Sequence, residues 1–217
     1  MLKGLLGGIP PVGWIAIGLL VVFKFVLPAF LPKIKGWQGE RAVKAGLARL
    51  DPERYHVHRD LYLPRPDGGG TTQIDHVVVS PYGVFVIETK NYRGWIFGSE
   101  KQKQWTQTIY KRKQRFQNPL HQNRLHVRAL EVFLGLDRRK FHSVVVFIGG
   151  STFKTPMPAN VLDRGFIRYI SEFRDPLLDE PTVAMIRERL RQLEGMTDRR
   201  QIAKEHIRSL QARGSCH

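Results

Sequence analysis

Cysteine and acidic residues are scarce in this chain. Cys216 is the single cysteine among 217 residues, which excludes an internal disulfide framework and fits a reducing compartment. Asp and Glu number 19 against 35 Lys and Arg, so the net charge is +16. This excess favours a polyanionic partner, either nucleic acid or an anionic membrane face, although a basic surface can also serve solubility.

Several familiar binding patterns are absent or incomplete. Residues 68–70 are three glycines without the Gly-Lys-Ser/Thr ending of a phosphate-binding P-loop, so they indicate a flexible hairpin loop. His56 and His58 have no Cys or acidic residue at metal-ligand spacing, and we interpret them as ordinary surface histidines. His121 and His126 are five residues apart and would not meet on one helical face. These patterns therefore predict neither a P-loop nor a histidine-based metal site.

An almost continuous apolar run extends from Val12 to Leu31, interrupted by Lys24 and Pro28. About 20 such residues match the hydrocarbon thickness of a bilayer, and no convincing signal-peptide cleavage site follows them. We therefore predict a single-pass transmembrane helix, so that the lipid bilayer is a partner of this segment. A buried helix of the soluble fold and a helix lying in one leaflet are the alternatives.

Basic residues are unevenly distributed around this apolar run. Only Lys3 precedes it, whereas five basic residues follow closely: Lys33, Lys35, Arg41, Lys44 and Arg49. By the positive-inside rule, the body of the protein then lies in the cytoplasm. The sequence thus predicts a protein of the inner (cytoplasmic) membrane with a soluble cytoplasmic domain.

Predicted helices and strands alternate along the rest of the chain. Helices are expected at residues 37–50, 119–134, 181–193 and 198–213. Strands are expected at 55–63, in a hairpin at 72–90, and at 95–97, 105–109 and 143–148. This order is typical of an α/β fold with a mixed central sheet flanked by helices. We divide the chain into an anchor and linker (1–35), a domain (36–150) and a C-terminal helical extension (151–217) that begins with a loop at 151–158.

Two carboxylates and a lysine stand inside the predicted hairpin, whose strands are otherwise apolar and joined by the turn at residues 80–83. Carboxylates in such strands are costly to bury unless something pairs with them, and a divalent cation is one such partner. Glu88 and Lys90 share one strand face. With two loop residues in the turn, Asp75 falls opposite Glu88, close enough to share a metal ion. A three-residue loop with Gly83 in the left-handed conformation would shift this register by one.

Four short segments at domain-like spacing carry a family pattern. They are Gly39-Glu40, Gln73-Ile74-Asp75-His76, Ile87-Glu88-Thr89-Lys90 followed by Asn91-Tyr92-Arg93-Gly94, and Asn118-Pro119-Leu120-His121-Gln122. Together they resemble the nuclease-related domain (NERD) of the PD-(D/E)XK nuclease superfamily, over about Gly36 to Gly150. Ile74 replaces the proline of the superfamily's nominal motif, at a position that contributes a backbone bend rather than a ligand.

The resemblance implies a metal site. Asp75 and Glu88 would ligate Mg²⁺ or Mn²⁺ with the help of the Thr89 carbonyl, because hard oxygen donors suit these ions. Glu40 would be a further ligand or would act through water. The competing interpretation is an ordinary Glu88–Lys90 ion pair, with Glu40 as a solvated helix residue.

The resemblance also assigns roles to two other polar residues. Lys90 would orient or deprotonate the attacking water and stabilise charge on the phosphate. Gln122 would point into the site from the later helix, which Asn118 would cap. Related proteins often carry a four-cysteine zinc module, but Cys216 and His217 alone cannot build a zinc site; a chain that ends before such a module is an alternative.

Basic residues interleaved with Trp105, Tyr110 and Phe116 could follow a nucleic-acid backbone while the aromatic rings stack on bases. The six basic residues are Lys101, Lys103, Lys111, Arg112, Lys113 and Arg115. A solvated basic face with partly buried aromatic rings is the alternative.

These patterns together predict a membrane-anchored, divalent-metal-dependent nuclease that hydrolyses phosphodiester bonds in DNA, in DNA processing or defence. RNA is an alternative substrate, and no pattern defines an oligomeric state. One rival is a catalytically silent module of the same fold that binds nucleic acid. Another is a membrane-tethered scaffold for proteins or anionic lipids. Intact Asp75, Glu88 and Lys90 favour the enzyme over both.

Overall fold

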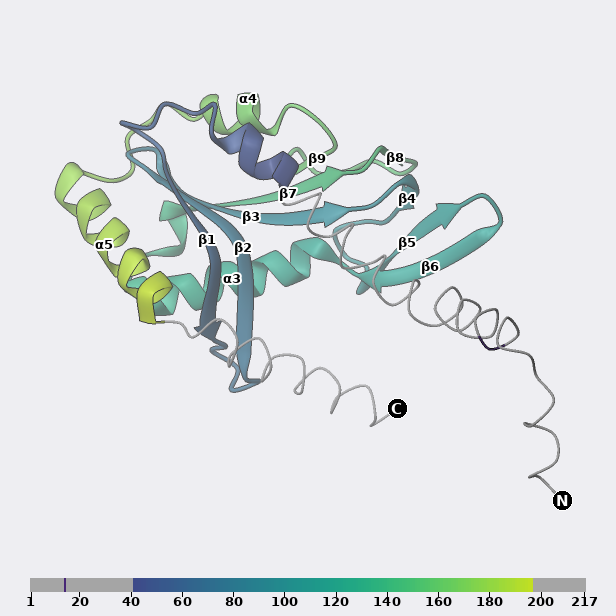
Figure 1. The fold of residues 1–217 in the computed structure, drawn as a ribbon, viewed down its shortest axis with the longest axis horizontal. Helices are drawn as coiled ribbons and strands as arrows, with labels where there is room; N and C mark the ends of the chain where they lie inside the picture. The colour runs from purple at the N-terminus through teal and green to yellow at the C-terminus, as the bar shows by residue number, and fades with distance from the viewer. Residues whose placement is uncertain (1–13, 15–40, 197–217) are drawn as a thin grey trace, which may run out of the picture. The chain divides into compact units, whose positions relative to one another are not determined.

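The computed structural model of the chain describes residue 14 and residues 41–196, and the strands within these residues form two mixed β-sheets (Figure 1). The first sheet has the order β1-β2-β3-β7-β9, formed by His56–Pro64, Thr71–Ser80, Gly83–Asn91, Phe141–Ile148 and Val161–Leu162. The second has the order β6-β5-β4-β8, formed by Arg112–Gln117, Gln104–Ile109, Gly94–Phe97 and Ser151–Phe153. The predicted mixed α/β architecture is confirmed.

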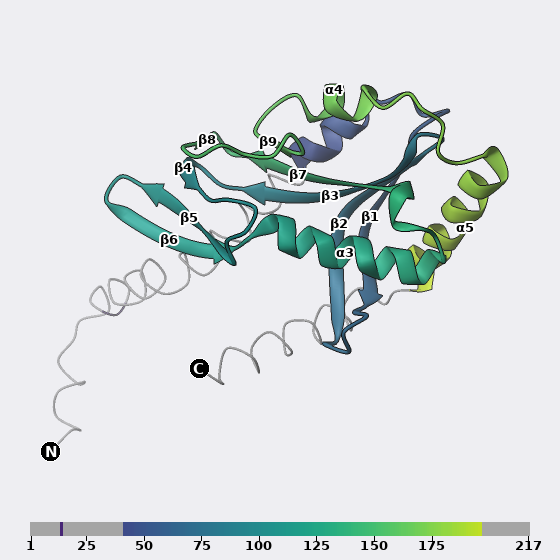
Figure 2. The same cartoon turned by 180° about the vertical axis from the view of Figure 1, so that it is seen from behind.

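Helices cover both faces of the first sheet (Figures 1 and 2). On one face, α3 (Pro119–Leu134) and α5 (Glu180–Met196) bury a core that includes Val86. On the other face, the helical residues 41–47 and α4 (Phe166–Ser171) bury a core around Phe85. Both faces of β3 are therefore covered, which explains its nearly continuous apolar sequence. A short 3-10 helix, η2 (Arg138–Lys140), precedes β7.

The start of α3 is fixed by Asn118. Its Oδ1 accepts a hydrogen bond from the Leu120 N–H at 2.9 Å, and Pro119 follows it as the first helical residue. Its Nδ2 donates to three carbonyls in the β4–β5 connection, those of Ser99, Glu100 and Gln102. The bounds predicted for this helix and the capping role of Asn118 are confirmed.

The β2–β3 hairpin has a two-residue loop. Ser80 pairs with Gly83, and the same register continues to the pair of His76 and Ile87. The two-residue alternative is therefore confirmed and the three-residue loop is excluded. Gly83 has φ 121, and a Cβ atom there would lie 2.8 Å from His142 Nε2. Glycine is required at this position by both conformation and space.

In β1 and β2, the alternation of side chains between the two faces of the sheet is interrupted near Asp60 and Asp75. Ile74 and Val77 of β2 belong to the same core, under α3 and α5, although strict alternation would place them on opposite faces. Asp60, at the corresponding level of β1, has φ 52, which few residues other than glycine adopt. Figure 1 shows β1 and β2 curving away from β3.

Some predicted elements differ from the structure or lie outside it. β6 and β8 occupy residues where no strand is predicted, so the expected loop at 151–158 is wrong at its start. The apolar run from Val12 to Leu31, apart from Trp14, and the predicted helix at 198–213 lie outside the described residues. Among the residues that are described, no helix is long and apolar enough to span a bilayer.

Gly83→Ala should lower the free energy of unfolding by about 2 kcal/mol or more, because it adds both a strained φ and a clash with His142. Gly68→Ala is the matched control: its φ is 72, but a Cβ there meets no atom within 4 Å. The control should lose only about 1 kcal/mol. Thermal unfolding of the full-length variants measures both, and equal losses would contradict the packing argument.

Candidate functional site

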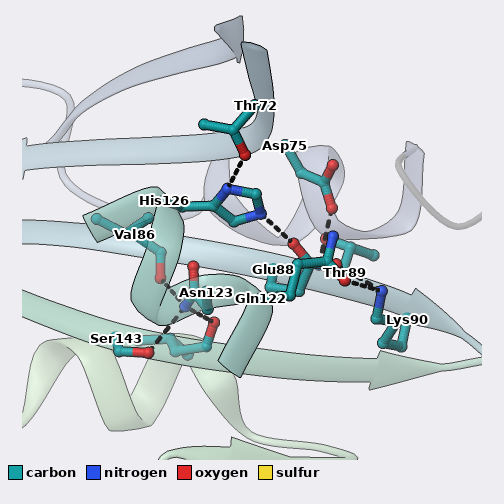
Figure 3. Close-up of polar contacts among 11 residues, drawn as sticks. Thr72, Asp75, Val86, Glu88, Thr89, Lys90, Gln122, Asn123, His126 and Ser143 are labelled. Carbon is teal, nitrogen blue, oxygen red and sulfur yellow. Dashed lines mark hydrogen bonds and ion pairs between the residues drawn. The ribbon is translucent and has the colours of Figure 1, made fainter. Parts of the chain in front are cut away.

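Glu88 is the centre of a buried polar cluster between β3 and α3 (Figure 3). Its side chain is 2% exposed, and Lys90 Nζ lies 2.6 Å from its Oε1. His126 Nε2 lies 3.0 Å from Oε2, and the opposite ring nitrogen of His126 lies 2.8 Å from the Thr72 hydroxyl. Since a carboxylate only accepts, the tautomer with a proton on Nε2 satisfies both contacts of the imidazole. Both oxygens of Glu88 therefore have partners.

The charges of this cluster reinforce one another. Burial alone would raise the pKa of Glu88, but the ammonium of Lys90 and the hydrogen bond from His126 outweigh burial, and the pKa lies below the usual 4.5. Burial opposes the charge of Lys90 as well, yet the Glu88 carboxylate raises the Lys90 pKa above the usual 10.5. Lys90 is consequently an ammonium at neutral pH. This state favours a charge-stabilising role for Lys90 over deprotonation of water.

Two residues of α3 reach the cluster from one helical face. Gln122 Oε1 accepts a hydrogen bond from Lys90 Nζ at 2.9 Å, so Gln122 contacts Lys90 from α3. His126 lies four residues further along α3, on the same face. The sequence analysis does not predict that His126 belongs to this cluster, because His126 and His121 are five residues apart. The only sequence signal for His126 is its four-residue spacing from Gln122.

Asp75 lies where β2 separates from β3. Continuing the hairpin register puts it level with Glu88, but the paired residues end at His76 and Ile87. Asp75 Oδ2 instead accepts the backbone N–H of Thr89 at 2.8 Å. The Asp75 carboxylate thus accepts the Thr89 N–H in place of a backbone carbonyl of a neighbouring strand. This hydrogen bond holds Asp75 against the β3 segment that carries Glu88 (Figure 3).

Asn123 holds α3 in position over the sheet. It is fully buried, and its Nδ2 lies 2.9 Å from the Val86 carbonyl, 2.9 Å from the Ser143 hydroxyl and 3.1 Å from the Val144 carbonyl. One amide therefore bonds to both β3 and β7. Because Gln122 is the adjacent residue, this attachment also sets the position from which Gln122 meets Lys90.

The groups beside Lys90 offer oxygen atoms, the type of ligand that hard divalent cations prefer. The Asp75 and Glu88 carboxylates and the Thr89 carbonyl are such donors, and Mg²⁺ is commonly held by one or two carboxylates together with substrate phosphates. Glu40, the further acidic residue implied by the family resemblance, lies outside the described residues. Within residues 41–196, no group of three or more His, Cys, Asp or Glu could hold a metal ion.

The predicted nucleic-acid-binding residues belong to a different part of the fold. They lie in the second sheet and its connections, and all are exposed: Lys101, Lys103, Lys111, Arg112, Lys113 and Arg115. Trp105 is fully buried, so its expected stacking on bases is wrong. Phe116 is half-buried, whereas Tyr110 is 97% exposed.

His58, which the sequence analysis interprets as a surface histidine, is buried. Its Nδ1 lies 3.4 Å from Glu194 Oε2.

The mixed sheet, with its helix-covered Glu-Thr-Lys strand, is consistent with a nuclease-like α/β domain. The model of the family described as "Nuclease-related domain", NERD, matches residues 35–148, and the chain belongs to this family. An uncharacterised protein of Bacillus anthracis is 49% identical over 117 residues, which cover 54% of this chain and 55% of that protein. The chain thus spans about half the length of this curated relative. No solved structure matches the chain.

Glu88→Gln should reduce the acid sensitivity of the fold. The lowered pKa means that ionised Glu88 contributes stability above its unfolded pKa, near 4.5, and that this contribution is lost as the pH falls through the folded pKa. At neutral pH the substitution should cost about 3 kcal/mol, because Lys90 loses its buried partner. Below pH 4.5 the difference from the wild type should shrink.

Melting temperatures measured from neutral to acidic pH in chelator test this expectation. Glu172→Gln is the control, because Glu172 forms an exposed ion pair with Arg168 on α4; it should keep the wild-type profile. A constant gap between the Glu88→Gln and wild-type profiles at all pH values would contradict the assignment of the charge to Glu88.

Proposed function

We propose that this chain is a divalent-metal-dependent nuclease that hydrolyses phosphodiester bonds in DNA. One observation carries the proposal: Asp75, Glu88 and Lys90 lie together where β2 leaves β3, and Gln122 of α3 binds Lys90. Membership of a family with a nuclease-like fold supports the same conclusion.

The roles of the residues follow from their charges. Asp75, Glu88 and the Thr89 carbonyl would hold Mg²⁺ or Mn²⁺, and Glu40 is a further candidate. When bound, such an ion polarises a phosphoryl oxygen and generates a nucleophilic hydroxide from water. Lys90 is an ammonium that can stabilise negative charge developing on the phosphate. Gln122 orients Lys90 through the 2.9 Å hydrogen bond.

A second candidate is a module of the same fold that binds nucleic acid without turnover. The specific observation in its favour is the pairing of both Glu88 oxygens, with Lys90 and with His126. An ion pair that already neutralises Glu88 can serve stability alone. The two candidates differ in whether bound DNA is cleaved when a divalent ion is present.

Purified full-length chain in detergent should cleave DNA with Mg²⁺ or Mn²⁺ and lose this activity in chelator. Asp75→Asn should reduce the cleavage rate at least about a hundredfold, because it removes the charge of a metal ligand. Gel analysis of single-stranded and duplex substrates gives the rates, and Glu172→Gln should match the wild type. Absence of cleavage by the wild type with every divalent ion would favour the binding module.

We also propose that the apolar run from Val12 to Leu31 anchors the chain in the inner membrane, with residues from Lys33 onward in the cytoplasm. The support is the length of the run and the excess of basic residues after it. Millimolar-scale Mg²⁺ and cellular DNA are expected on that side. The bilayer would then confine the nuclease to DNA that approaches the membrane.

Full-length protein should resist alkaline carbonate extraction from membranes. A variant with Leu19→Asp and Val22→Asp should become extractable, because each Asp at the centre of a spanning helix costs about 3 kcal/mol. Val132→Asp, an exposed position on α3, is the control and should stay in the membrane fraction. Protease cleavage after residue 36 from outside intact cells would contradict the orientation.

A further inference from the structure

Tyr110 combines backbone strain with exposure. Its φ is 52, in a region that residues other than glycine rarely adopt, and the residue is 97% exposed at the β5–β6 turn. The positive φ costs stability, and an exposed ring recovers little of this through burial. Folding alone therefore gives no reason for a tyrosine at this turn, which points to a functional one.

A pocket of about 430 Å³ lies beside this ring. It is lined by Arg93, Gly94, Trp95, Thr108, Ile109 and Tyr110. Trp95 is 52% exposed, and Lys154 Nζ lies 4.8 Å from the centroid of its ring. Two exposed aromatic residues and an arginine thus line one hollow, and Lys154 lies beside the ring of Trp95. This set of side chains suits a flat aromatic ligand attached to an anion.

Two of the pocket residues, Trp95 and Thr108, lie on the outer face of the second sheet. Trp95 pairs with Thr108, and Thr108 pairs with Lys113, so these three side chains form one cross-strand row. The next row on the same face is Phe97, Thr106 and Arg115, which line a second cavity of about 910 Å³. The alternate residues, including Ile96 and Trp105, face the core. The aromatic pocket therefore lies on the same sheet face as Lys113 and Arg115.

The excess of basic residues around this face favours a polyanionic ligand. Residues 101–130 contain no Asp or Glu. Within this range, the second sheet and its connections carry six basic residues: Lys101, Lys103, Lys111, Arg112, Lys113 and Arg115. A polymer that alternates anionic groups with flat rings would match the sheet face better than an anionic surface without rings.

We propose that the outer face of the second sheet binds a single-stranded segment of nucleic acid, with one unpaired base in the pocket between Trp95 and Tyr110. Lys113 and Arg115 contact the phosphates of the same strand. A base inside a duplex is covered on both sides by its neighbours, so only an unpaired base can enter the pocket. This inference rests on the proposed nuclease function for its substrate class, and it specifies the strandedness of that substrate.

Fluorescence anisotropy of full-length chain in detergent and chelator, with labelled oligothymidine and a duplex as probes, tests the stacking. Trp95→Ala and Tyr110→Gly should each weaken oligothymidine binding about tenfold. Tyr110→Gly also relieves the positive φ, so its melting temperature should not fall below that of the wild type. A loss of affinity in that variant therefore cannot come from unfolding. Val132→Ala, an exposed aliphatic position on α3, should bind like the wild type.

Salt dependence separates stacking from charge. Replacing Lys113 and Arg115 together with Gln should reduce the slope of log affinity against log salt by about one to two. Trp95→Ala and Tyr110→Gly should lower affinity with the slope unchanged. Parallel measurements with oligouridine determine whether the face discriminates RNA from DNA, and similar effects of the aromatic variants on either strand support the inference.

Two outcomes would overturn the inference. One is that duplex and oligothymidine bind with equal affinity and that neither Trp95→Ala nor Tyr110→Gly changes this affinity. The other is a loss of binding to phosphatidylglycerol vesicles in these variants with oligothymidine binding unchanged, which would make the face a membrane contact. Because chelator prevents turnover, a catalytically inactive chain that still shows Trp95-dependent binding supports the inference while contradicting the nuclease proposal.

Discussion

The buried charge of Glu88 is the constraint on which the arrangement of this domain depends. An isolated carboxylate in such a position would cost several kcal/mol, so its partners must be held in place. Lys90 and His126 provide them, and each is bound in turn by a further residue, Gln122 or Thr72. These contacts join β2, β3 and α3. The relative positions of the hairpin and the helix are thus coupled to the ionisation of one side chain.

The position of α3 connects this cluster to the second sheet. Asn118 caps the helix and binds the β4–β5 connection, while Asn123 bonds to β3 and β7. Residues 118–123 therefore contact both the first sheet and the β4–β5 connection of the second sheet. The chain enters α3 directly from β6 and leaves β3 directly into β4. Nucleic acid on the second sheet would consequently bind a surface that is joined through α3 and the β3–β4 connection to Gln122 and Lys90.

Local patterns predict part of this structure well. The hairpin register follows from the turn because Ser80 and Gly83 fix every later pair, and α3 follows from an Asn-Pro start. β6 is missed because it is an edge strand on which only Phe116 is even partly buried, so it shows no alternation of buried and exposed residues. His126 is missed because its partner, Glu88, lies 38 residues away. Trp105 is misjudged because its ring stacks on Phe147 of β7, which is distant in sequence.

The pairing of Glu88 has a consequence for catalysis under the proposed function. Oε1 of Glu88 is already bound by Lys90 at 2.6 Å, so the Lys90 ammonium would repel a divalent cation held by this carboxylate. A substrate phosphate offers Lys90 another anionic partner. Movement of the Lys90 side chain toward the phosphate would relieve that repulsion and expose the carboxylate oxygen to the ion. Metal and substrate would then bind cooperatively, because each favours the same position of one lysine side chain.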